Sequence, residues 1–326
     1  MKPLALISCY FGPLPNTLPL WLKSCGTNPD TDWFLFTDQK VEAPPSNVHV
    51  IEMSLAEAGT RCRERIDPAT ILPKPYKLCD YKPLYGTLFS DHLQDYAFWG
   101  YCDLDVVFGR LSDFFTQERL DRYDKLLTLG HLSIYRNTPE VAGRVRAPGS
   151  RIPLEKVITD PRTCAFDEFN GIYSIYKANG FPMCEEVPFA DISCLWKRFR
   201  LHTRSSKRYQ RPAENHDHQL FYWENGELRR AWLDDRGDVR EDSFLYIHLP
   251  RRRFPDPPVC DAFFCTPAGF LPKTPGKTPT AEEIRRLNPY PGRLYEWIER
   301  KIRRRAMKRE DHRRFVRRKE CGSSGS

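Results

Sequence analysis

Two aspartates separated by one residue are the feature of this sequence that most directly suggests chemistry. Asp103 and Asp105 flank Leu104 inside an apolar and aromatic run, Phe98–Gly109. A buried strand explains the flanks but not the carboxylates, which an extended backbone places on one side while Leu104 points to the other. Hard divalent cations prefer such oxygen ligands. The spacing predicts a Mg²⁺ or Mn²⁺ site able to carry a diphosphate. The alternative is that one Asp caps a turn and the other pairs with an Arg.

A second acidic pair, Asp167 and Glu168, stands just before the turn residues Asn170 and Gly171. A group-transfer enzyme needs a base that takes the proton from an attacking hydroxyl, and a carboxylate can do this. Acidic residues are also common before turns, so both interpretations stay open. The residues from Phe166 to Tyr176 are expected to form this turn and then an alternating strand.

His248 ends a predicted strand, Ser243–His248, and three arginines, Arg251–Arg253, follow shortly after it. An imidazole can ligate a metal, while guanidinium groups bind phosphate. The pattern therefore predicts that His248 completes the cation site and that Arg251 and Arg252 reach the diphosphate. The alternative is an ordinary core histidine.

Lys77, Asp80 and Lys82 lie at the front of a predicted helix or helix pair, Tyr76–His92, which leads into the strand of the two aspartates. Charged residues at the start of a helix can contact phosphate and sugar. A solvated first turn explains them equally well.

The elements that must position these residues predict an α/β fold. The first part of the chain has three strand patterns and one short helix: Leu4–Phe11, Leu18–Ser24 (helix), Asp32–Thr37 and Asn47–Met53. This order is typical of nucleotide-binding α/β domains, in which ligands bind at the carboxyl ends of the strands. Phe11 and Asp38 lie at such ends, so Asp38 could bind a base or ribose, or only form a turn. Asn215–Trp223 is expected to be helical.

The charge distribution separates a near-neutral body from a basic tail. The chain of 326 residues carries a net charge of +8, and residues 300–319 hold twelve Lys or Arg against two acidic residues. The remainder is therefore slightly acidic. The eleven cysteines include no C-x-x-C pair, which favours reduced thiols over a zinc site. No stretch reaches the roughly 20 apolar residues of a membrane span.

Four regions are predicted along the chain: a catalytic domain over 1–254, a Pro-rich linker over 255–281, a basic amphipathic helix over 282–321, and an added linker over 322–326. In the helical region, one apolar stripe opposes a set of arginines; the stripe comprises Leu294, Trp297, Ile298, Ile302 and Ala306. Such a helix is typical of contact with an anionic membrane surface. Packing of the helix on the domain is the alternative.

Several motifs together resemble a known family. They are C-Y-F-G, W-L-x-S-C, D-W-x-x-F-T-D, K-x-C-D-x-K-P-x-Y-G and F-W-G-Y-C-D-L-D-V-x-F-G, with the later F-D-E and Y-I-H-x-x-x-R segments. Over residues 4–253 the chain resembles bacterial capsule and lipopolysaccharide glycosyltransferases of GT-A fold. The resemblance implies a Rossmann-type mixed sheet flanked by helices, a nucleotide-diphosphate sugar donor and a divalent metal, Mn²⁺ or Mg²⁺.

The resemblance also implies roles for single residues. Asp105 would contact metal and diphosphate, Asp103 would contact ribose or metal, and His248 would complete the metal site. Phe11 and Asp38 would hold base and ribose. Lys77, Asp80 and Lys82 would approach the donor sugar and diphosphate, and Arg251–Arg253 would lie near the phosphates. Asp167 or Glu168 would be the base of an inverting enzyme. The chain departs from the family at Pro250, which could move the arginines away from the phosphates.

The expected function is transfer of a sugar from a UDP-sugar, with UDP-galactofuranose as one candidate, to a hydroxyl of a capsule or O-antigen glycan, free or lipid-linked. The expected location is cytoplasmic, at the inner face of the membrane. A metal-dependent nucleotide-sugar or phosphoester hydrolase would use the same aspartates with water as acceptor. A polyanion-binding protein is a third class, but the tail lacks the aromatic pattern of a nucleic-acid binder, so no nucleic-acid partner is expected.

Overall fold

The computed structural model describes residues 2–202 and 214–322, and the chain divides into two compact units. The first unit comprises Met1–Ala190, Glu224–Leu228 and Phe244–His248. The second comprises Asp191–Trp223, Arg229–Ser243 and Leu249–Ser326. Each unit is described by itself.

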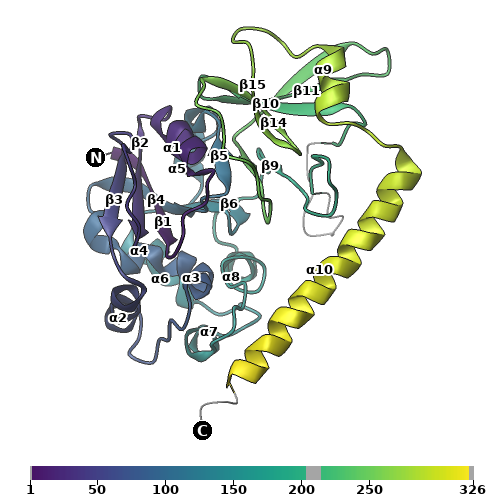
Figure 1. Ribbon diagram of the computed structural model, residues 1–326. Coiled ribbons are helices and arrows are strands. Elements are labelled where there is room, and N and C mark those ends of the chain that lie inside the picture. Colours follow the sequence, from purple (N-terminus) through teal and green to yellow (C-terminus); the bar gives the residue numbers. More distant parts are fainter. Residues whose placement is uncertain (1, 203–213, 323–326) are drawn as a thin grey trace. The chain divides into compact units, whose positions relative to one another are not determined.

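A seven-stranded mixed sheet forms the centre of the first unit (Figure 1), in the order β3-β2-β1-β4-β7-β6-β8. Its strands are β1 (Lys2–Tyr10), β2 (Thr31–Thr37), β3 (Val48–Glu52), β4 (Tyr96–Cys102), β6 (Lys125–Leu129), β7 (Leu132–Arg136) and β8 (Met183–Cys184). Strands β1 to β4 run parallel, whereas β7 is antiparallel to β4 and to β6. The predicted α/β class with a mixed sheet is confirmed.

Helices cover this sheet because each strand of its centre is apolar on both faces. The longer ones are α1 (Leu18–Gly26), α2 (Leu55–Arg65), α5 (Gln117–Arg122), α6 (Pro139–Gly143), α7 (Leu154–Thr159) and α8 (Ile172–Asn179), with short turns at Leu111–Asp113 and Arg144–Arg146. One apolar cluster joins Ile7, Phe36 and Trp99 of the sheet to residues of α2, α6, α7 and α8. Helix α1 packs near β3 and β5 instead.

The predicted helix over Tyr76–His92 is a chain of short helical turns. They are a turn at Pro75–Lys77, α3 (Leu78–Tyr81), a turn at Lys82–Leu84, α4 (Tyr85–Leu88) and a turn at Ser90–His92. Proline lacks the backbone N–H that a continuous helix needs, so Pro83 is one cause of the division. The stretch is largely buried, including Lys77, Asp80 and Lys82, and its apolar residues join the same cluster as those of the sheet.

The predicted strand over Phe98–Gly109 is divided in two by the acidic motif. β4 ends at Cys102, and β5 (Val106–Phe108) pairs antiparallel with β13 (Tyr246–His248) in a separate small sheet that also includes β9 (Ala190–Asp191). Two acidic side chains at this point favour an open edge over a continuous ladder. The motif therefore connects the two strands and belongs to neither sheet.

Two secondary-structure predictions are wrong. The residues after Gly171 form helix α8, because the apolar residues at 172, 173, 175 and 176 follow a helical repeat. Gly180 ends this helix in the left-handed conformation, with φ 64°. The stretch Asn215–Trp223 instead leads into strand β10 (Gln219–Glu224), which is buried on both faces and so lacks polar alternation.

The second unit contains a five-stranded sheet in the order β12-β11-β10-β14-β15. Its further strands are β11 (Glu227–Leu233), β12 (Val239–Phe244), β14 (Ala262–Thr266) and β15 (Gly269–Pro272). The expected linker over 255–281 thus contains two strands, because the apolar residues of β14 pair with those of β15 across a tight turn at Pro267 and Ala268. Helix α9 (Ala281–Leu287) begins with a capping box at Thr280.

Helix α10 (Arg293–Gly322) confirms the predicted C-terminal helix (Figure 1). The predicted segment 282–321 is not one helix, however, because a stretch with Pro289 and Pro291 separates α9 from α10. Polar contacts attach it to the loop around residues 193–200. Glu296 pairs with Arg198 and Arg200, and the backbone N–H of Lys197 donates to Glu299 at 3.0 Å. Both glutamates are nearly buried. The helix therefore packs on its own unit largely through charged side chains, while Leu294, Trp297 and Ile302 are exposed.

Candidate active site

The two aspartates of the D-L-D motif lie side by side at the carboxyl end of β4. Leu104 is buried, with 5% exposure, while the side chains of Asp103 and Asp105 are 35% and 42% exposed. The backbone N–H of Asp103 donates to the carbonyl of His131, at 3.1 Å, in the turn between β6 and β7. This bond fixes the backbone where the strand ends, and carboxylate oxygens of Asp103 and Asp105 lie within 4.8 Å of each other.

His248, at the end of β13, brings its imidazole close to the two aspartates. In the antiparallel register, His248 lies opposite Val106, the residue next to Asp105. Its Nε2 atom is 3.5 Å from Oδ1 of Asp105, and the ligand atoms of Asp103, Asp105 and His248 all lie within 4.8 Å of one another. Partial burial acts to raise the pKa of Asp105, but the imidazole of His248 lowers it below its usual value.

This donor set fits a divalent cation. Two carboxylates and one imidazole are ligands that Mn²⁺ accepts, and Mg²⁺ accepts the carboxylates. The lowered pKa of Asp105 keeps that carboxylate ionised at neutral pH. Asp103 presents two oxygens, of which Oδ1 contacts Lys82, so its second oxygen can serve a cation.

Lys82 connects the two acidic pairs that the sequence singles out. Its Nζ atom donates to Oδ1 of Asp103 at 2.6 Å and to the carbonyl of Gly130 at 2.7 Å, and it lies 3.8 Å from Oδ2 of Asp167. Burial acts to lower the pKa of Lys82, but the negative charges around it, chiefly that of Asp103, raise it well above its usual value. The ammonium is therefore charged and joins the D-L-D motif to the second acidic pair.

Asp167 is buried against the turn between β6 and β7. Its side chain is 9% exposed, and a Cβ atom on Gly130 would lie only 2.3 Å from its Oδ2. Burial raises the pKa of Asp167 to about 8, and Lys82 partly opposes this effect. Its neighbour Glu168 accepts a hydrogen bond from the backbone N–H of Gly130 at 3.4 Å.

Lys77 and Asp80 form an ion pair, with Nζ and Oδ2 at 2.9 Å, in which both side chains are fully buried. Lys77 also donates to the carbonyl of Arg162 at 2.9 Å. The carboxylate of Asp80 accepts the backbone N–H groups of Cys164 and Phe166. These two residues thus contact the segment that precedes Asp167.

Phe11 and Asp38 follow the ends of neighbouring parallel strands, as predicted. Phe11 is buried, and Asp38 is exposed and accepts the backbone N–H of Gly12 at 2.9 Å. This hydrogen bond lowers the pKa of Asp38. Gly12 has φ 96°, a conformation that few other residues adopt, so the bond fixes a sharp turn at the end of β1.

His131 is a site residue that the sequence reasoning missed. Its ring stacks on that of His248, with centroids 4.2 Å apart, and its Nδ1 atom is 2.8 Å from the hydroxyl of Tyr246. Its carbonyl is the acceptor for Asp103. The available signal was a Gly-His turn between two apolar strand patterns, which is too common to identify a site by itself.

Arg251 and Arg252, which the sequence predicts to lie near the diphosphate, belong to the second unit, and Arg251 is exposed. The guanidinium of Arg252 donates to the carbonyls of Ser193, Trp196 and Lys197 at 2.9–3.0 Å and lies over the ring of Phe199. Burial lowers the pKa of Arg252 to about 10. Arg252 therefore organises the same loop that helix α10 contacts.

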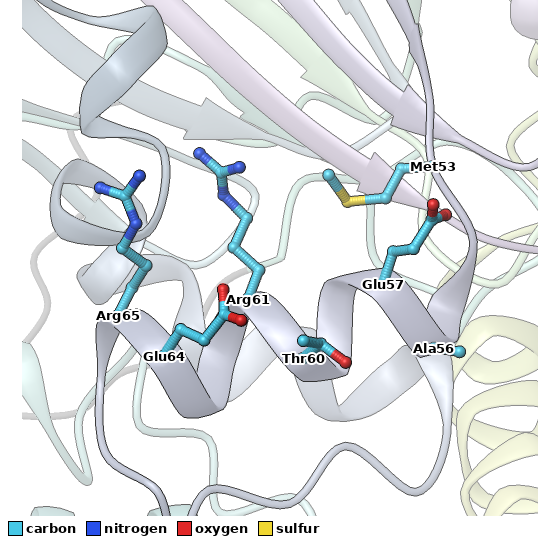
Figure 2. A pocket seen from close by; sticks show the side chains of 7 residues that line it. All are labelled: Met53, Ala56, Glu57, Thr60, Arg61, Glu64 and Arg65. Atoms are coloured by element: carbon cyan, nitrogen blue, oxygen red, sulfur yellow. The ribbon is translucent and has the colours of Figure 1, made fainter.

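A shallow hollow of about 370 Å³ lies along α2 (Figure 2). It is lined by Met53, Ala56, Glu57, Thr60, Arg61, Glu64 and Arg65. Its cations already have partners in the fold, since Arg61 donates to the carbonyl of Leu88 and pairs with Asp91. The hollow includes none of the residues of the acidic site.

The chain belongs to a family described as "Family of unknown function (DUF6625)", whose model matches residues 6–274. No curated protein matches the chain. Among solved structures, the chain is similar to the galactosyltransferase LgtC in complex with donor and acceptor sugar analogues. The similarity has 10% identity and a TM-score of 0.36, and it covers 58% of this chain and 75% of that chain. At this TM-score it carries no conclusion about activity.

Among the described residues, no helix is both long enough and apolar enough to cross a membrane.

Proposed function

We propose that the chain is a metal-dependent glycosyltransferase that uses a nucleotide-diphosphate sugar. One observation carries the proposal: Asp103, Asp105 and His248 present ligand atoms within 4.8 Å of one another at the carboxyl end of β4. This is the end of an α/β sheet where ligands bind. A second acidic pair stands next to this group, joined to it through Lys82.

The donor would bind at the end of β1, β2 and β4. A bound Mn²⁺ or Mg²⁺ would neutralise the diphosphate and stabilise its charge as it leaves. Asp103, Asp105 and His248 would hold that cation, while Phe11 and Asp38 lie at neighbouring strand ends suited to base and ribose. Lys82 adds a buried positive charge beside Asp103, which favours an anionic ligand at this end of the sheet.

Asp167 or Glu168 would take the proton from the acceptor hydroxyl, which implies an inverting reaction. Asp167 is held near the metal ligands by Lys82, and Glu168 contacts the same turn through Gly130. A raised pKa suits a base that must hold a proton during the reaction, because proton transfer is most efficient when the pKa lies near the working pH.

The identity of donor and acceptor rests on the motif resemblance. It suggests a UDP-sugar, including UDP-galactofuranose, and a capsule or O-antigen glycan as acceptor. A hydrolase would use the same site with water. The two differ in one measurement, the release of UDP from UDP-sugars with Mn²⁺, with and without added glycan acceptor. The transferase predicts that acceptor stimulates release and that Asp105→Ala abolishes it. Release that no acceptor stimulates would support the hydrolase.

Attachment to an anionic membrane surface at the cytoplasmic face is part of this proposal. Helix α10 exposes Leu294, Trp297 and Ile302 at 72%, 54% and 61%, among many Lys and Arg residues. Exposed aromatic and aliphatic side chains beside cations suit the boundary between headgroups and acyl chains of acidic lipids.

A further inference from the structure

The ion pair of Lys77 and Asp80 is fully buried, and it contacts the segment just before Asp167. Both side chains are fully buried, so neither can touch a bound donor from this position. Burying two charges is costly unless each charge finds further hydrogen bonds. Here those bonds all go to one segment, residues 162–166, which immediately precedes the acidic pair.

Asp80 holds this segment by two backbone N–H groups. Its Oδ1 accepts from Cys164 at 3.0 Å and from Phe166 at 3.1 Å, while its Oδ2 accepts from Cys164 at 2.9 Å and from Lys77. Between the two amides, Ala165 has φ 52°, a left-handed conformation that is unfavourable for a residue with a Cβ. The pair therefore stabilises a backbone turn that the sequence alone disfavours.

The same stretch of chain contacts both acidic pairs of the site. Two residues after Asp80, Lys82 donates to Asp103 and lies 3.8 Å from Asp167. Residues 77–82 thus hold the backbone just before Asp167 at one end and the carboxylates of Asp103 and Asp167 at the other. The distance between the metal-binding group and the candidate base depends on this stretch.

We propose that Lys77 and Asp80 are positioning residues: together they fix the 162–166 turn so that Asp167 and Glu168 face the acceptor position. The positioning of Asp167 or Glu168 as the base rests on the proposed function. The hydrogen bonds that fix residues 162–166 are independent of that function. The sequence predicts that Lys77 and Asp80 contact the sugar and diphosphate of the donor. Because both side chains are fully buried, we instead assign them this indirect role.

Two double variants test the proposal. Lys77→Met/Asp80→Leu removes the charges as a pair, which avoids stranding one of them, and leaves no acceptor for the two amides. Lys77→Met/Asp80→Asn keeps one side-chain oxygen, and Oδ1 alone accepts both amides in the structure. The measurements are hydrogen exchange of the segment 162–170, UDP binding with Mn²⁺, and release of UDP from UDP-sugars with Mn²⁺ and glycan acceptor.

In Lys77→Met/Asp80→Leu, we expect the amide hydrogens of Cys164 and Phe166 to exchange about tenfold faster or more than in the wild type. We also expect kcat to fall about tenfold or more. UDP affinity and the KM for donor should stay within about twofold. The Asn variant should restore both properties. Asp124→Asn/Arg144→Met is the control, since it removes the partly buried ion pairs of Asp124 with Arg136 and Arg144 in the same unit, at residues outside the site.

Unchanged exchange in the Leu variant would overturn the proposal. So would a raised KM with unchanged kcat, which would indicate contact with the donor, or an equal loss of kcat in the control pair. If the wild-type protein bound no UDP with Mn²⁺, the proposed function would fail instead, and amide exchange would still decide whether the pair holds the turn.

Discussion

Asp167 and Lys82 are neighbours with opposite electrostatic situations. Lys82 has Asp103 within hydrogen-bonding distance and keeps its charge, whereas Asp167 lies at the longer distance and is buried. Burial of the carboxyl outweighs the attraction of the ammonium, so the pKa of Asp167 is raised to about 8. At neutral pH, Asp167 therefore holds a proton, and Lys82 mainly serves Asp103.

This difference predicts an effect of Asp167 on stability. Between its unfolded pKa, near 3.8, and its folded pKa of about 8, the folded state holds a proton that the unfolded state lacks. Stability therefore falls as pH rises through this window. Asp167→Asn removes the dependence, so we expect it to exceed the wild type in free energy of unfolding by more than about 1 kcal/mol at pH 8, with little gain at pH 4.

Urea unfolding at several pH values measures this effect, and Asp105→Asn is the control. The pKa of Asp105 is lowered in the folded state, so its charge contributes stability above its unfolded pKa, and this contribution is lost as pH falls. The control should thus be less stable than the wild type at neutral pH. A pH dependence in Asp167→Asn equal to that of the wild type would contradict the assignment.

The same pKa predicts a pH profile if Asp167 is the base. Only an ionised carboxylate accepts a proton, so kcat should rise with pH towards about 8 and then level off. Asp167→Asn should lose both the rise and most of the activity. The base would be Glu168 instead if kcat of the wild type did not rise with pH in this range and if Glu168→Gln, but not Asp167→Asn, lost activity.

Among the secondary-structure connections, the turn between β6 and β7 makes several hydrogen bonds with residues of the site. It supplies the carbonyl of His131 to Asp103, the carbonyl of Gly130 to Lys82, and the N–H of Gly130 to Glu168. Gly130 has no side chain, which allows Asp167 to approach the backbone closely. The turn thus contacts the backbone of Asp103 and the side chains of Lys82 and Glu168.

We predict that Gly130→Ala displaces Asp167, because the new Cβ would lie 2.3 Å from its Oδ2 and 3.0 Å from its Cγ. A loss of about 1–3 kcal/mol in stability is expected, with a larger relative loss in kcat than in UDP affinity. Thermal unfolding and UDP titration measure both. Gly143→Ala in α6 is the matched control, since its Cβ would meet no atom within 4 Å. Equal effects of the two substitutions would refute the close approach at Gly130.

If helix α10 binds a membrane through its exposed apolar side chains, substitution of those side chains should weaken the binding. Trp297→Ser and Ile302→Ser replace exposed side chains, so stability should change by less than about 0.5 kcal/mol. We expect cosedimentation with vesicles that contain acidic phospholipid to fall about tenfold or more, since each side chain would lose buried apolar area. Val259→Ser, at a fully exposed position outside α10, is the control. Equal binding of the wild type to neutral and acidic vesicles would contradict the charge-based part of the proposal.

For the whole molecule, local patterns predicted the sheet better than the site. The strands around Ile7, Leu35 and Trp99 follow directly from apolar runs bounded by turn residues, and the buried Leu104 follows from alternation. Helix α8 was wrongly predicted as a strand because it is a short run rich in Ile and Tyr, which are residue types typical of strands. Strand β10 was wrongly predicted as a helix because burial on both faces removes alternation.

The contacts within the site could not be predicted, because they join residues distant in sequence. Lys82 contacts Gly130 across 48 positions, and Asp80 contacts Phe166 across 86. The D-L-D spacing is local and was recognisable, whereas burial of the Lys77 pair depends on how the helical turns pack under the sheet. Residue types alone therefore suggested chemistry at Lys77 and Asp80 without indicating that they act on the backbone.

The most direct test of the central claim is isothermal titration of UDP and GDP into the protein with Mn²⁺ and with EDTA. The proposed function predicts that one nucleotide binds only with the metal, and that Asp105→Ala abolishes this binding while the variant remains folded. The same affinity with Mn²⁺ and with EDTA, unchanged in Asp105→Ala, would contradict it. Asp103, Asp105 and His248 would then be a structural cluster.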